Sequence, residues 1–209
     1  MNETRAYHHG NLRQSLIDAA LQAVEEQGYQ ALSLRDLAQV LEVSRGAPYR
    51  HFADRDALLR ACACEGFRRL LDAHSETARS SGTAGDRARA ACRAFLAFAE
   101  AQPGLFLLMY DSGLLQQAEE EDELGARLHQ IYCGIAATLR DALEESDDER
   151  LQARLIAMWS TLYGYARLRQ SNMLKPYMLG ALSREQTEAA VITAAIGPLP
   201  GAHGTRRMG

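Results

Sequence analysis

The sequence has little of several features that mark common protein classes. It contains one lysine, Lys175, one tryptophan and five prolines, and its formal net charge is −4. An acidic chain lacks the overall basic field that draws many proteins to nucleic acid, so any DNA contact must come from a local cationic face. No apolar run reaches membrane length, and the polar, histidine-rich N-terminus has no signal-peptide pattern. We therefore expect a soluble, cytoplasmic protein.

Cysteine is also scarce. The four cysteines, Cys62, Cys64, Cys92 and Cys133, include no Cys-x-x-Cys pair, so no disulfide framework is expected. Cys62 and Cys64 lie two positions apart, about 200° around a helix, and cannot easily share a metal ion. We expect all four thiols to be reduced and to pack as small buried hydrophobic groups.

Patterns that carry enzyme chemistry are missing as well. The six histidines are scattered, without a carboxylate or cysteine partner at the spacing of a metal site or a catalytic triad. No glycine-rich phosphate loop follows a strand. We therefore expect no enzyme activity, no catalytic residue, no metal and no cofactor.

What the chain does have is a pair of short amphipathic helices in Ser33–Leu59, hinged at Glu42-Val43. One helix face is marked by apolar residues at intervals of three and four: Leu34, Leu37, Ala38 and Leu41. Ser33 stands at the N-cap position of this helix, with Asp36 placed for a capping box. Ser44 offers a cap for a second helix over 45–52, which is too short to be stable unless it packs on its neighbour. Two such helices form a helix-turn-helix.

The second helix has the composition of a surface that meets DNA. This composition does not favour a stable helix, because Gly46 lowers helix propensity and Pro48 removes a backbone hydrogen-bond donor. Gly46 and Ala47 are also small. Small residues allow close approach to a large partner, and donors for phosphates and base edges come from Arg45, Tyr49, Arg50 and His51. The alternative is an ordinary helical hairpin whose arginines are solvated.

A longer pattern of residues surrounds this hairpin. Its members are, in order, Gly28, Tyr29, Ser33, Leu37, Ala38, Val43, Ser44, Gly46, Tyr49, His51, Phe52, Arg55, Ala57, Leu58 and Leu59. Their spacing resembles the DNA-binding domain of the tetracycline-repressor-like (TetR) family, specifically from about Leu12 to Leu71 and more weakly beyond. The resemblance implies a DNA-binding transcriptional regulator, a repressor released from a palindromic operator by a small molecule. It also implies that Ser33, Tyr49, His51 and Arg55 hold phosphates, and that Arg45, Gly46, Ala47 and Pro48 face base edges.

Helical periodicity and caps predict an all-α fold without any sheet. Beyond the hairpin, the expected helices cover 11–27, 54 or 55 to beyond Leu71, 86–101, 105–112, 124–145, 148 to about 173, and 183–196. We divide the chain into an N-terminal three-helix, helix-turn-helix DNA-binding domain (1–60), a C-terminal helical ligand-binding and dimerisation domain (61–197), and a disordered tail (198–209).

The C-terminal part carries two further features. The segment Met158–Gly164 resembles the Trp-His-Gly signature of one C-terminal subgroup of the family, with Tyr163 in place of the histidine. A set of aromatic, sulfur-containing and polar residues is expected to face inward and line a small-molecule pocket: Phe95, Phe98, Phe106, Met109, Tyr110, His129, Cys133, Trp159 and Tyr163. A filled core is the alternative for each of them.

The family resemblance further implies a homodimer through the last two long helices, with two recognition helices about 34 Å apart. Plausible contacts across the two-fold axis are Ile156, Thr161, Leu168, Val191, Ala194 and Ala195. One rival interpretation is a helical ligand-binding or interaction protein without DNA activity, which the acidic charge favours. Another is an enzyme, which would need a carboxylate in a cavity beside His129.

Overall fold

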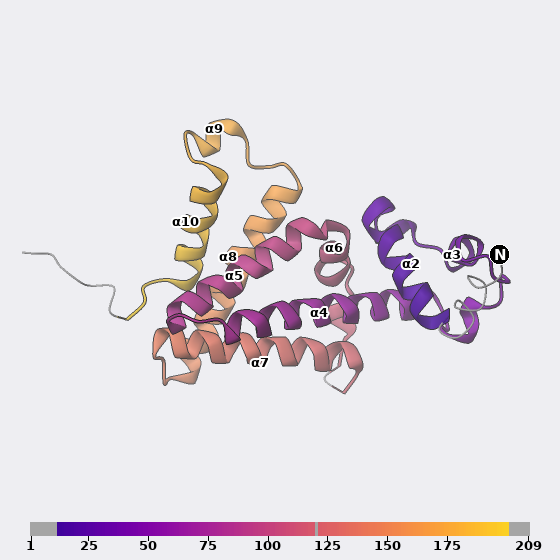
Figure 1. The fold of residues 1–209 in the computed structure, drawn as a ribbon, viewed down its shortest axis with the longest axis horizontal. Helices are drawn as coiled ribbons and strands as arrows, with labels where there is room; N and C mark the ends of the chain where they lie inside the picture. Colours follow the sequence, from indigo (N-terminus) through magenta and orange to yellow (C-terminus); the bar gives the residue numbers. More distant parts are fainter. Residues whose placement is uncertain (1–11, 120, 201–209) are drawn as a thin grey trace, which may run out of the picture. The chain divides into compact units, whose positions relative to one another are not determined.

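The computed structural model describes residues 12–119 and 121–200, and all regular structure in these ranges is helical (Figure 1). The helices are α2 (Leu12–Gln27), α3 (Leu34–Val40), α4 (Arg55–Arg79), α5 (Ala84–Ala101), α6 (Pro103–Asp111), α7 (Glu123–Leu143), α8 (Asp148–Gln170), α9 (Pro176–Leu179) and α10 (Arg184–Ile196). Short 3₁₀ helices lie at Tyr29–Ala31, Pro48–Arg50 and Leu114–Gln117. The predicted all-α class is confirmed. The predicted tail, apart from residues 198–200, lies outside the described ranges.

Packing divides the described chain into two compact units. Unit 1 consists of the residues up to Arg69 together with Gln102–His129, and unit 2 of Leu70–Ala101 with the residues from Gln130 onward. Helices α2, α3 and α6 therefore belong to unit 1, whereas α5, α8, α9 and α10 belong to unit 2. The long helices α4 and α7 contribute to both. The predicted boundary between the DNA-binding and ligand-binding domains, after residue 60, falls inside α4. This functional division of the chain stays a prediction.

Several helix ends form for the local reasons that the sequence suggests. Gly28 ends α2 with a backbone φ of +83°, which residues with a side chain rarely adopt. The predicted N-cap at Ser33 is confirmed, since its hydroxyl accepts from the Asp36 amide. Asp54 likewise caps α4, with a carboxylate that accepts from the Ala57 amide at 2.8 Å. Ser183 forms a capping box at the start of α10. The expected loop through residue 176 contains the additional short helix α9.

Unit 1 has its core where α2, α3 and the segment before α4 meet. Leu16, Ala20 and Val24 on α2 have no exposed surface, and Leu37 and Phe52 are buried against them. Ala23, Leu41 and Val43, at the margin of this core, are only half-buried. Burial of these side chains holds the helix-turn-helix, because its helices are too short to be stable alone.

Helix α6 completes unit 1 by packing directly on the backbone of α2. The carboxylate of Glu25 accepts hydrogen bonds from the Gly104 and Leu105 amides, both at 2.9 Å, and so caps the first turn of α6. A Cβ atom at Gly104 would lie 2.4 Å from the Val24 carbonyl oxygen, so only glycine allows this approach. The Tyr29 hydroxyl donates to the Asp111 carbonyl at the other end of α6.

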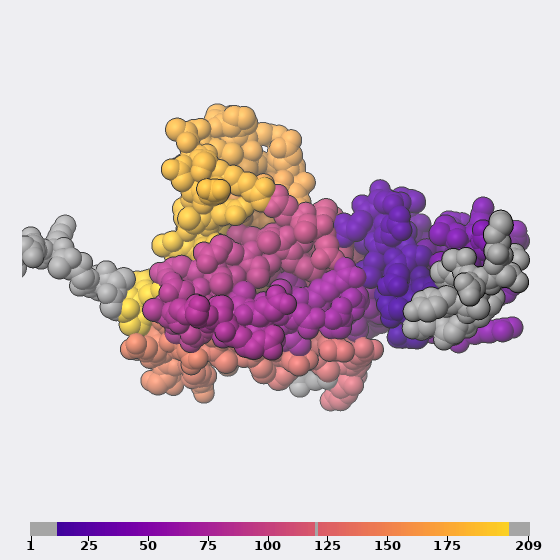
Figure 2. Space-filling view, viewed as in Figure 1, coloured from indigo at the N-terminus to yellow at the C-terminus, as the bar shows by residue number. Residues whose placement is uncertain are grey.

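Unit 2 is held together mainly by α5, α8 and α10, which pack on one another. The buried side chains of α8 recur at intervals of three and four: Leu151, Leu155, Met158, Leu162, Tyr165 and Ala166. Ion pairs join Arg169 of α8 and Arg184 of α10 to Glu100 of α5 and Glu188 of α10. At the end of the α8–α10 hairpin, α9 and its flanks expose Met173, Tyr177, Met178 and Leu182 (Figures 1 and 2).

No single helix in the described ranges is long and apolar enough to cross a membrane, and the pair Ala84–Ala101 and Pro103–Gln117 meets that test only when taken together.

Candidate nucleic-acid interface

The segment that follows α3 is more compact than the helix expected over 45–52. Helix α3 ends where Glu42 adopts a left-handed conformation, and the Val43 amide donates back to the Ala38 carbonyl. The chain then makes a turn closed by the Ala47 amide and the Ser44 carbonyl at 2.9 Å. Regular helix is limited to the 3₁₀ turn Pro48–Arg50. The prediction of a helix here is wrong in length, because proline lacks an amide donor and glycine weakens the preceding turn.

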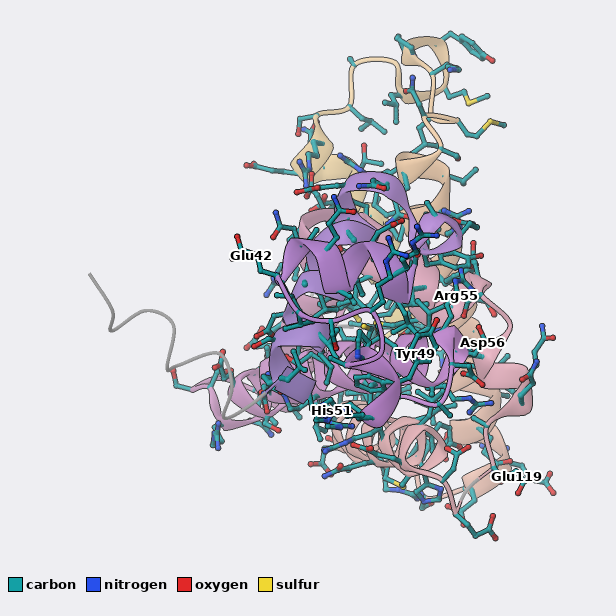
Figure 3. The ribbon with its side chains drawn as sticks, turned by 90° about the vertical axis from the view of Figure 1, so that its right-hand side faces the viewer. Glu42, Tyr49, His51, Arg55, Asp56 and Glu119 are labelled. Atoms are coloured by element: carbon teal, nitrogen blue, oxygen red, sulfur yellow. The ribbon has the colours of Figure 1, made fainter. Side chains whose placement is uncertain are left out.

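The polar side chains of this segment point outward. Arg45, Tyr49, Arg50 and His51 are exposed, with 55% of the Tyr49 side-chain surface open to solvent. In the view of Figure 3, Tyr49 and His51 are labelled near each other, with Glu42 further up and to the left. The turn therefore exposes three types of hydrogen-bond donor: guanidinium, phenol and imidazole. Donors of these types can contact phosphates and base edges.

The small residues of the segment divide between the surface and the interior. Gly46 is exposed, with no atom within 4 Å of where a Cβ would lie, and Ala47 is half-buried. Pro48 is buried, so the expectation that it faces base edges is wrong. Its ring lies on the side of the 3₁₀ turn that packs on α2 and α3, and this packing holds the exposed residues in place.

Two of the expected phosphate contacts have other partners within the protein. Ser33 is half-buried and its hydroxyl accepts from the Asp36 amide. The Arg55 guanidinium turns back onto the chain between α2 and α3, where it donates to the carbonyls of Tyr29, Gln30 and Leu32. Arg55 is therefore engaged within unit 1. Sequence reasoning missed this role because the carbonyls lie 23 to 26 residues away in the chain.

The remaining arginines of the predicted cationic face differ in their surroundings. Arg13 lies over the ring of Phe52, 5.4 Å from its centroid. Arg60 pairs with Asp122 at 3.4 Å. Arg45 and Arg50 remain the exposed arginines on the turn itself.

The nine predicted pocket residues divide between the two units. Phe106, Met109, Tyr110 and His129 belong to unit 1, and Phe95, Phe98, Cys133, Trp159 and Tyr163 to unit 2. Phe106 and Met109 are fully buried, and the Tyr110 ring contacts Phe106 and Phe67 with centroids 4.8 and 5.8 Å apart. In unit 2, Phe98 is buried, Phe95 is half-buried, and the Trp159 and Tyr163 rings lie 6.4 Å apart.

Three of these residues do not face inward as expected. His129 and Cys133 are exposed, and 49% of the Trp159 surface is open to solvent. The reason is helical geometry: Trp159 lies one position beyond buried Met158, and Cys133 two positions beyond buried Ile131. The expectation that all four cysteines are buried is therefore wrong for Cys133. Burial of Cys62 and Cys92 raises the pKa of each thiol to about 12.

Comparison with known families accounts for this arrangement. Residues 16–62 match the family described as "Bacterial regulatory proteins, tetR family", and residues 88–194 match the "Tetracyclin repressor-like, C-terminal domain". The chain belongs to the TetR family. As a TetR-family protein it is a DNA-binding transcriptional regulator and not an enzyme. The helix-turn-helix described above lies within the N-terminal match.

The chain is also similar to individual proteins over most of its length. The transcriptional regulator BetI of Burkholderia thailandensis is 29% identical over 157 residues, which cover 72% of this chain and 79% of BetI. A protein of unknown function from Rhodococcus sp. RHA1 is 30% identical, with a TM-score of 0.68, over 91% of this chain and 94% of that one. LfrR of Mycobacterium smegmatis, solved with proflavine, shares the fold at 19% identity and a TM-score of 0.62, over 88% and 93% of the two chains.

Proposed function

We propose that this TetR-family regulator is a cytoplasmic repressor that binds a palindromic operator as a homodimer and leaves it when a small molecule binds. The observation that carries the DNA-reading part is the exposed turn after α3. Arg45, Tyr49, Arg50 and His51 project from it, while Pro48 and Phe52 anchor it in the core of unit 1. Rigid support of exposed donors is what groove recognition needs.

In this proposal Arg45, with the small residues Gly46 and Ala47, approaches base edges. Tyr49 and His51 hold phosphates on either side, and the Ser33 hydroxyl adds a phosphate contact near the start of α3. A bidentate arginine contact discriminates by about 1–3 kcal/mol between a matching and a wrong base. Phosphate contacts, by comparison, fix orientation without reading sequence.

Homodimer formation through α8 and α10 is supported by apolar surface on those helices. Ile156 and Leu168 of α8 are 63% and 43% exposed, and Ala194 of α10 is also exposed. Large aliphatic side chains left in water at these levels favour a partner surface. A two-fold axis there would set two recognition turns about one helical repeat apart, roughly 34 Å. Ala195 is buried within unit 2 and is not available for this contact.

Family membership supports an effector site in the C-terminal domain, and LfrR, a regulator with the same fold, has been solved in complex with the small molecule proflavine. We propose that Phe95, Phe98 and Tyr163, all of unit 2, contribute to it. We also propose that Met158–Gly164 belongs to the Trp-His-Gly subgroup. Tyr163 then supplies a phenol where the signature has an imidazole, and its ring contact with Trp159 keeps the aromatic pair.

A mobility shift with the DNA upstream of the protein's own coding region tests this proposal, run over a series of salt concentrations. Repression predicts a salt-dependent complex that survives excess random DNA, and reduced transcription from that fragment in a purified system. Small-molecule binding without any salt-dependent DNA affinity would instead support a helical ligand-binding protein that lacks DNA activity. Size measurement of the same preparation separates failure of dimer formation from failure of DNA recognition.

A further inference from the structure

We propose that Arg55 is a positioning residue for DNA binding, which closes the base of the helix-turn-helix instead of holding a phosphate. This inference rests on DNA binding by the helix-turn-helix and is independent of the proposed effector and dimer. Arg55 is the first residue of α4 and is labelled in Figure 3.

The Arg55 guanidinium has an acceptor for each of its nitrogen atoms. Nε donates to the Leu32 carbonyl at 3.1 Å, and Nη2 donates to the carbonyls of Gln30, at 3.3 Å, and Tyr29. Nη1 donates to the Asp56 carboxylate at 3.3 Å. These bonds use four of the five N–H donors, so a phosphate could reach only the remaining Nη1 donor without displacing a partner, and the Asp56 carboxylate would repel it. The side chain is therefore already committed to the backbone.

The carbonyls that Arg55 engages belong to the short connection between α2 and α3. After Gly28 the chain makes the single 3₁₀ turn Tyr29–Ala31, and a turn this short leaves carbonyls near its end without a helical amide to accept from. The Tyr29 carbonyl accepts from the Leu32 amide as well as from Arg55. A guanidinium has five donors in a flat fork and can serve several of them at once. An ammonium group carries the same charge at one point and cannot span the same set.

Leu32 and Arg55 bracket the whole DNA-facing segment, residues 33–54. The hydrogen bond between them joins the two ends of a loop that contains α3, the turn at Glu42 and the exposed donors Arg45 to His51. Asp54 caps α4 and so fixes the backbone from which Arg55 extends. Joining the ends restricts the conformations of the loop before DNA arrives, which lowers the ordering cost of binding.

This role predicts a pattern that a phosphate contact does not. A lost phosphate contact lowers the slope of log K against log salt concentration by about one, and lysine can replace arginine there. A lost positioning contact leaves that slope unchanged, because no counterion release is altered. Lysine then fails, because it cannot bridge the carbonyls.

The test uses full-length Arg55→Lys and Arg55→Gln proteins and two duplexes of equal length, one from upstream of the coding region and one of random sequence. Both variants are expected to bind the upstream duplex about five- to twentyfold more weakly, with the salt slope of the unmodified protein. Arg50→Gln is the matched control, since it removes an exposed guanidinium and is expected to lower the slope by about one. A slope lowered by about one in Arg55→Gln, or binding restored by lysine, overturns the proposal.

Hydrogen exchange gives a second measurement that needs no DNA. The Ala31 and Leu32 amides donate to the carbonyls of Gly28 and Tyr29 and close the turn that Arg55 holds. In Arg55→Lys and Arg55→Gln, checked by thermal unfolding to be folded, a peptide covering residues 28–34 is expected to exchange at least about threefold faster. Unchanged exchange in folded Arg55→Gln contradicts the positioning role.

Discussion

The contact between α2 and α6 makes a sharp prediction for Gly104. In Gly104→Ala the new methyl group would lie 2.4 Å from the Val24 carbonyl oxygen and 2.9 Å from the Glu25 Cα atom. Both neighbours are backbone atoms of α2, which cannot rotate away as a side chain can, so α6 must move by about 1 Å to reach ordinary contact distance. That movement also breaks the two hydrogen bonds from the Gly104 and Leu105 amides to the Glu25 carboxylate.

The magnitude follows from these two losses. Overpacking costs roughly 1–3 kcal/mol, and two exposed hydrogen bonds to a carboxylate add about 1 kcal/mol together. We expect Gly104→Ala to lower the free energy of unfolding by about 3 kcal/mol. For a chain of this size that corresponds to a fall in Tm of about 6–12 °C.

Calorimetry or thermal denaturation followed by circular dichroism measures this change. Gly46→Ala is the control, because no atom lies within 4 Å of where its Cβ would be and its φ is not positive. Its Tm should change by less than about 4 °C. Adding Glu25→Gln to Gly104→Ala should cost much less than Glu25→Gln alone, since the bonds are already broken. A Tm for Gly104→Ala within about 2 °C of the unmodified protein refutes this account of α6 docking.

Other predictions concern a thiol, a histidine and the proposed dimer face. In the native protein a thiol reagent should modify Cys133 rapidly and leave Cys62, Cys64 and Cys92 unmodified, because the first is exposed and the others are buried with raised pKa values; modification of more than one thiol per folded chain would contradict the packing. Desolvation lowers the pKa of His74, whose Nδ1 has no partner among the described residues while Nε2 contacts the Thr138 hydroxyl at 3.3 Å. Because the unfolded chain then binds the proton more readily, the stability contributed by neutral His74 is complete above about pH 6.5 and is lost as the pH falls toward the lowered pKa. In His74→Gln, a plot of the denaturation midpoint against pH should therefore be flatter below about pH 6.5 than in the unmodified protein. An unchanged slope in this plot would contradict the prediction. Ile156→Arg should leave the Tm of the monomer nearly unchanged, because the Ile156 side chain is 63% exposed. It should halve the molecular mass measured by sedimentation. A variant that still sediments as a dimer would show that Ile156 does not lie in the dimer interface.

Local signals in the sequence predicted much of this fold. Caps at Ser33, Asp54 and Ser183 and the glycine at position 28 act within one helical turn, so their positions are visible without knowledge of the fold. The inward stripe of α8 at Leu151, Leu155, Met158 and Leu162 also follows from spacing. That same spacing places Trp159 off the stripe, and it could have corrected the expectation that Trp159 faces inward.

Contacts between distant segments could not be predicted in this way. The carboxylate of Glu25 caps a helix 79 residues later, and Arg55 bonds to carbonyls 23 to 26 residues earlier. Nothing in the composition around either residue distinguishes it from a solvated charge. The length of the turn after α3 depends on how Pro48 packs on α2 and α3, which is again a property of the folded unit.

The central claim is that the exposed turn from Arg45 to His51 reads DNA. Its most direct test compares Arg45→Ala and Tyr49→Ala on the upstream duplex and on random duplex of the same length. We expect Tyr49→Ala to weaken binding to both duplexes alike, and Arg45→Ala to lose about 1–3 kcal/mol only on the upstream sequence. Equal losses on the two duplexes for both variants, or no loss for either, would contradict the claim.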